Sequence, residues 1–164
     1  MGDRDINSIR KQIESSESQN DYSAVNTLWL ALLRMANLMP ENAEHKRIVA
    51  LVDKIQVDSI RGLLHDPGVD RLLELDPPIE TILTSPHERL EREAAAKELN
   101  EIRTFRDSDP HQALVSLGSV LKRIRNKREH GFKSPNGPRD LEVLGAARSV
   151  LLRLAWLAME SFKV

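Results

Sequence analysis

Apolar residues recur at steps of three and four along most of the 164-residue chain, and this spacing constrains the fold more than any other feature. Such a repeat places apolar side chains on one face of an α-helix, whereas a half-buried strand shows strict alternation. The sequence contains no alternating run of useful length and no internal repeat. We therefore predict an all-α fold, a helical bundle that forms a single domain over residues 1–164.

Cap and turn residues divide this pattern into helices. Helices are predicted over residues 5–15, 21–39, 41–65 with a possible bend near 56–58, 86–106, and 110–130, followed by a last helix from Pro138. Residues 66–85 contain several proline turns and are predicted to form at most short helical turns. The N-terminal helical part thus covers about residues 1–107. The last two helices, about residues 109–162, are joined by a short connector and are predicted to form an antiparallel hairpin.

The composition is that of an ordinary globular protein, with 40% hydrophobic and 30% charged residues. The chain has no cysteine, so a disulfide framework and a thiolate site are both excluded. Its longest apolar runs are far shorter than a membrane span, and the first residues lack a secretory apolar segment. We therefore expect a cytoplasmic protein with no membrane association.

The net charge of −1 conceals a marked division along the chain. Residues 1–110 contain 14 Lys/Arg against 21 Asp/Glu, whereas residues 111–164 contain 10 against 4. A basic segment beside an acidic one, in a chain that is nearly neutral as a whole, is typical of nucleic-acid binding on the basic side. The alternative, that helix surfaces collect one sign of charge without function, remains open.

The basic charge is concentrated at the end of the predicted helix 110–130. Five cationic side chains and His130 lie within residues 122–130. Asp109 is a suitable N-cap, Pro110 suits the first helical position, and Gln112 stands where a capping box requires it. Gly131 can end the helix.

The helical wheel separates the two faces of this helix. Its apolar face consists of Leu114, Leu117, Val120, Leu121 and Ile124. The predicted outward face carries small residues early and polar ones late: Ser116, Ser119, Lys122, Asn126 and His130. Arg125 lies on the flank. We expect this polar face to point to solvent, a partner or a ligand.

The sequence Arg125-Asn126-x-x-x-His130-Gly131 resembles the motif of HEPN domains, in particular their Apea-like members, over about residues 108–160. Active members of that family are metal-independent endoribonucleases, and some act as toxins or in phage defence. Other members have kept the helices as binding modules. The resemblance implies that Arg125, Asn126 and His130 form the catalytic set, with no metal and no cofactor.

The chemistry of these residue types suits RNA cleavage, because RNA carries its own nucleophile in the 2′-hydroxyl group. Histidine can act as acid or base near neutral pH, so His130 can transfer protons. Arg125 can bind phosphate oxygens with its planar fork, and Asn126 can orient the imidazole or the phosphate. The remaining cations are expected to contact RNA: Lys122, Arg123, Lys127, Arg128 and Lys133.

One helix supplies only one histidine, whereas cleavage needs both an acid and a base. The resemblance implies a homodimer that places two motifs face to face. Two alternatives stay open. The chain can be a catalytically silent HEPN module that pairs with a partner such as a nucleotidyltransferase-like antitoxin. The segment can also be a plain basic helix end, with a capping histidine and an exposed Arg125–Glu129 pair.

Other polar clusters in the sequence have simpler interpretations. His45 and His65 have no partners at metal-ligand spacing and are predicted to be surface residues. The acids of the helix 86–106 are predicted to form a solvated face with four-residue charge pairs. These acids are Glu91, Glu93, Glu98 and Glu101.

Overall fold

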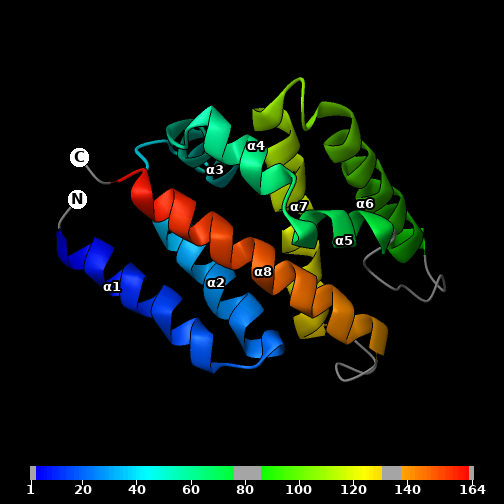
Figure 1. Ribbon diagram of the computed structural model, residues 1–164, viewed down its shortest axis with the longest axis horizontal. Coiled ribbons are helices and arrows are strands. Elements are labelled where there is room, and N and C mark those ends of the chain that lie inside the picture. Colours follow the sequence, from blue (N-terminus) through cyan, green and yellow to red (C-terminus); the bar gives the residue numbers. More distant parts are fainter. Residues whose placement is uncertain (1–2, 76–85, 131–137, 163–164) are drawn as a thin grey trace.

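The computed structural model describes residues 3–75, 86–130 and 138–162, which form eight α-helices and no strand (Figure 1). The helices are α1 (Asp3–Ser15), α2 (Asp21–Ala36), α3 (Glu44–Lys54), α4 (Val57–Leu64), α5 (Pro67–Glu74), α6 (Pro86–Phe105), α7 (Pro110–His130) and α8 (Pro138–Glu160). The all-α prediction is confirmed for this part of the chain. No helix in these three ranges is long and apolar enough to cross a bilayer.

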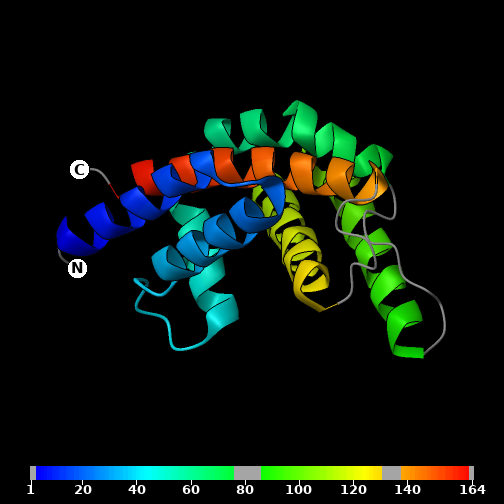
Figure 2. The same cartoon turned by 90° about the horizontal axis from the view of Figure 1, so that it is seen from below.

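The long helix α8 connects the two sides of the molecule. It packs against α2 and α5, and α1 lies beside α2 (Figure 1). Helices α6 and α7 pack against each other, and both extend away from α8 on the same side (Figure 2). The last turns of α7 therefore lie far from α8.

Helix starts follow from polar residues that cap free backbone N–H groups. The Asn20 side chain accepts a hydrogen bond from the Ser23 amide at 2.8 Å before α2. The Asp66 carboxylate accepts one from the Gly68 amide at 2.8 Å, with Pro67 at the first position of α5. Such caps satisfy donors that have no intrahelical partner.

The bend predicted near residues 56–58 is a complete break between two helices. Ile55 and Gln56 adopt extended backbone conformations, and α4 begins at Val57. Ile55 is only 5% exposed. The break thus lets the Ile55 side chain enter the core. A continuous helix over residues 41–65 would have had an imperfect apolar face at this point.

One continuous hydrophobic core includes residues from all eight helices of the described chain. The apolar stripes predicted from sequence supply most of it, and the largest fully buried side chains include Ile9, Ile13, Leu28, Met35, Ile60, Leu63, Leu99, Ile102 and Leu114. Leu90, an apolar residue of the helix predicted over residues 86–106, is an exception. It is 63% exposed, because it lies in the first turns of α6, beyond the part of that helix that the core covers.

The antiparallel hairpin predicted for the last two helices is not confirmed. Helices α7 and α8 cross, and their main packing partners are α6 and α2 respectively (Figures 1 and 2). A connector length limits the distance between two helix ends, but it does not determine which faces pack.

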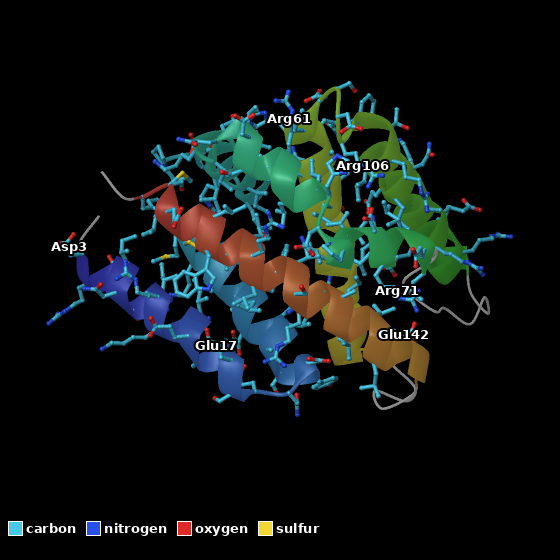
Figure 3. The ribbon with its side chains drawn as sticks, viewed as in Figure 1. Asp3, Glu17, Arg61, Arg71, Arg106 and Glu142 are labelled. Carbon is cyan, nitrogen blue, oxygen red and sulfur yellow. The ribbon has the colours of Figure 1, made fainter. Side chains whose placement is uncertain are left out.

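Surface ion pairs link α5 to its neighbours. Arg71 donates hydrogen bonds to Glu74 and to Glu142 of α8, and Arg106 pairs with Asp70 at 2.9 Å (Figure 3). These groups are largely exposed, so the pairs contribute little to stability. Their effect is to orient a short helix on the core.

Candidate active site

Helix α7 carries the motif, and its observed range agrees with the predicted one. The Asp109 side chain accepts a hydrogen bond from the Gln112 amide at 3.3 Å, so the predicted N-cap is confirmed. A capping box would have the Gln112 side chain accept from the Asp109 backbone amide; the Gln112 side chain donates to Ser116 at 3.5 Å. Arg125 and Asn126 lie in the last turns, and His130 is the final residue of the helix.

The Arg125 guanidinium is held by two amide side chains. Its Nε donates to Oδ1 of Asn26 on α2 at 3.0 Å, and its Nη1 donates to Oδ1 of Asn126 at 3.3 Å. Both Arg125 and Asn126 are half-buried. The position of the guanidinium is therefore determined jointly by α7 and α2.

Several predicted site residues lie outside the described part of the chain. They are the side chains of Lys127, Arg128 and His130, and the whole of Gly131 and Lys133. The backbone of α7 nevertheless relates two of the motif residues. Asn126 and His130 are four residues apart in a continuous helix, so their backbone positions lie on the same face of α7.

Arg123, which we expected to contact RNA, forms an ion pair with α6. Its Nε and Nη2 donate to the two carboxylate oxygens of Glu98 at 2.9 and 3.0 Å, and Glu91 lies 3.6 Å from Nη1. These hydrogen bonds raise the pKa of the Arg123 guanidinium above its ordinary value, although burial acts in the opposite direction. An RNA phosphate would have to compete with Glu98 for this cation.

The predicted outward face of α7 is wrong for its two serines. Ser116 is 3% exposed and donates to Glu101 at 2.7 Å, and Ser119 donates to Glu98 at 2.8 Å. Helix α6 covers this face. The prediction that all the acids of α6 form a solvated face is wrong for Glu98 and Glu101 as well.

Two residues of this region were missed by sequence reasoning. Glu98 carried no signal, because a carboxylate on a charged helix has many local partners. Asn26 carried a weak signal in the sequence, because asparagine is a poor helix former and stands here among apolar residues of α2. Asn26 and Arg125 are 99 residues apart, so no local pattern connects them.

Lys122 is exposed, and no carboxylate of the described side chains forms an ion pair with it. His45 and His65 are exposed as predicted, although His65 contacts Asp107 at 2.8 Å. Among the residues that the structure describes, no three His, Cys, Asp or Glu side chains lie close enough to hold a metal ion.

The Glu98–Arg123 pair gives a stability prediction. Because the side chains of Glu98 and Arg123 are only 16% and 24% exposed, Glu98→Ala leaves a poorly hydrated guanidinium with only the more distant Glu91, 3.6 Å away. We expect a loss of about 1–3 kcal/mol in the free energy of unfolding, measured by urea denaturation. Glu93→Ala, at an exposed position of the same helix, is the control and should change stability by less than about 0.5 kcal/mol. Equal effects of the two changes would refute a stabilising role for the pair.

Comparisons of the chain with models of known protein families, with curated proteins and with solved structures found no match.

Proposed function

We propose that this protein is a metal-independent endoribonuclease of the HEPN type, and that it acts as a toxin or phage-defence effector. The observation that carries the proposal is the hydrogen bond between Arg125 and Asn126 on a basic helix that ends at His130. It puts a phosphate-binding group and an amide next to each other, one turn before a residue that can transfer protons.

In the proposed reaction the 2′-oxygen of a ribose attacks the adjacent phosphorus atom. A base removes the 2′-hydroxyl proton, and an acid protonates the departing 5′-oxygen. His130 performs these proton transfers, and Arg125 stabilises the negative charge that develops on the phosphoryl oxygens. The products are a 2′,3′-cyclic phosphate and a 5′-hydroxyl group, and no water is consumed.

The two amides that contact Arg125 fit this role. Asn26 and Asn126 accept hydrogen bonds from two N–H groups of the guanidinium and so help to orient it. A group held in advance at the place where charge develops does not have to reorganise during the reaction.

A homodimer would supply both the acid and the base from one motif. A twofold interface brings the same patch of both subunits together, so two copies of His130 would face one cleft. Because Ser116 and Ser119 are covered by α6, the proposed contact has to use the last turns of α7 instead. The cations there repel each other across the axis, and a bound RNA would relieve this repulsion.

RNA cleavage should persist in EDTA, because the ribose hydroxyl is the nucleophile and His130 and Arg125 supply the proton transfer and the charge. The measurement is the rate of cleavage of bulk RNA and tRNA by the purified protein, in EDTA and in Mg²⁺. The two rates should agree within about threefold, a difference of less than about 1 kcal/mol. Activity that disappears with the chelator and returns with Mg²⁺ contradicts the mechanism. Identical rates for wild type and His130→Ala would indicate a contaminating nuclease.

One observation favours a second function, that of a catalytically silent HEPN module paired with a nucleotidyltransferase-like antitoxin. Arg123, a cation expected to bind RNA, is engaged by Glu98 within the fold. In that case purified protein would leave RNA intact and would bind the partner through the basic end of α7.

A further inference from the structure

A cavity of about 330 Å³ lies between α2, α3, α7 and α8. Small-molecule sites in proteins have volumes of about 300–1,000 Å³, so the cavity is large enough for a compact ligand. Its walls are mostly apolar and include Trp29 and Leu32 of α2, Leu51 of α3, Leu114 of α7 and Leu154 of α8.

Part of the wall belongs to the core, because Leu32, Leu51 and Leu154 line the cavity and are only 8%, 5% and 7% exposed. Other wall residues, among them Leu33 and Ile48, are only partly buried. An occupant would therefore contact four helices. A row of side chains from a partner helix would need a longer and more open surface.

The charged or titratable residues that line the cavity are Lys122 of α7 and the first two residues of α3, Glu44 and His45, and all three are exposed. The first turn of α3 and the last turns of α7 point to the same edge of the molecule, at the bottom of Figure 2. Leu51 lies about two turns after Glu44 on α3, and Leu114 about two turns before Lys122 on α7. The exposed residues therefore define the mouth of the cavity, and the buried leucines its inner part.

The mouth carries one cation, Lys122, and one carboxylate, Glu44, so the partners of each decide which ligand charge it can bind. Lys122 is exposed, and no described carboxylate forms an ion pair with it. Glu44 lies in the first turn of α3, where the helix dipole already stabilises a negative charge. Lys122 is therefore the group that gains most from a ligand of opposite charge.

From this arrangement we infer that the cavity binds a small amphipathic monoanion, an alkyl carboxylate whose chain occupies the apolar end and whose head group meets Lys122. The inference is independent of the proposed RNA cleavage. A nucleobase fits less well, because its hydrogen-bonding edges would face leucine and tryptophan side chains, which leave polar groups without partners.

Gly118 allows a sharp test of the cavity. It lines the cavity on α7, and a Cβ atom built on it meets no heavy atom within 4 Å. Gly118→Ala therefore adds a methyl group without a clash and leaves most of the space open, whereas Gly118→Leu adds a longer side chain that should occupy part of the space a ligand needs. Both changes remove a helical glycine, so both should raise the melting temperature.

The probe is decanoate, titrated by calorimetry below its micellar concentration. Wild type and Gly118→Ala should bind it saturably, and Gly118→Leu should lose binding while remaining folded. Gly145→Ala on α8 controls for stabilisation outside the cavity and should bind like wild type. Undiminished binding by Gly118→Leu, or no binding by wild type, overturns the inference.

The head group is tested separately. Lys122→Gln should weaken decanoate binding by about tenfold, as expected for the loss of a charge-assisted hydrogen bond. Lys97→Gln, at an exposed position of α6, should leave it unchanged. Decanol should bind wild type more weakly than decanoate, and decyltrimethylammonium more weakly still. Preference for the cation, or tighter binding of uridine monophosphate than of decanoate, contradicts an amphipathic anion.

Discussion

Replacing His130 with alanine is expected to lower the rate of RNA cleavage by about 10²–10⁴-fold, the usual contribution of a general acid or base. His130 is the final residue of α7, so its loss removes no interior turn of the helix. Folding should therefore be almost unaffected, with a change of less than about 0.5 kcal/mol in the free energy of unfolding.

Arg125→Ala should reduce cleavage by about 10²–10³-fold, because one preorganised donor to the developing charge is lost. Arg125→Lys keeps the charge but not the planar fork, and should recover only part of the rate. Since Arg125 also contacts Asn26 of α2, some loss of stability is expected for both variants.

The measurements for these variants are single-turnover cleavage rates and thermal unfolding followed by circular dichroism. Arg61→Ala is the control for removal of a cation, because Arg61 is exposed on α4 and pairs only locally with Asp58. It should cleave like wild type. If His130→Ala instead melted like a core variant, His130 would be structural and its proposed role would be wrong.

Leu121→Ala should destabilise the fold by about 2–5 kcal/mol, the range for a leucine truncated in a packed core. Leu121 is fully buried on the apolar face of α7, directly before the motif. Leu151→Ala, equally buried on α8, should have a similar effect. The truncations leave cavities that the surrounding helices can only partly fill.

Urea denaturation of these variants gives the loss directly. Leu141→Ala is the matched control on α8, because Leu141 is 45% exposed. It should cost less than about 1 kcal/mol, since little of its apolar surface is removed from water on folding. A loss for Leu121→Ala as small as that for Leu141→Ala would mean that the core is not packed as described.

The helices themselves were predictable from local sequence. The apolar face predicted for α7 is buried, with Leu114 2% exposed and Leu117, Leu121 and Ile124 fully covered. The N-cap at Asp109 was predictable for the same reason. Periodicity and capping depend on residues within a few positions, so a single sequence contains the information.

The partners of each helix were not predictable in the same way. Ser119 lies nearly opposite the apolar face of α7 and Ser116 lies on its flank, and the predicted outward face included both. They are covered because α6 packs on that side and supplies Glu101 and Glu98 as acceptors. A wheel identifies the most apolar face of a helix, but a helix inside a bundle contacts neighbours on more than one face.

Contacts between distant residues were the least predictable part of the candidate site. Arg125 binds Asn26 across 99 positions, and His65 meets Asp107 across 42. Each pair depends on how two helices cross. The residue types of the motif indicate a chemistry. The contact between Arg125 and Asn26 depends on how α2 packs against α7, which local sequence does not determine.

The most direct test of the proposed ribonuclease uses two substrates that differ by one oxygen atom. Bulk RNA and tRNA are first incubated with wild type in EDTA to find a cleavage site, and a short RNA containing that site is then compared with the same RNA carrying a single 2′-deoxy residue there. The proposal predicts cleavage of the first, with 2′,3′-cyclic phosphate and 5′-hydroxyl ends, and none of the second at that position. Failure of wild type to cleave any RNA in the first step, or cleavage of the deoxy substrate at that position, would contradict it.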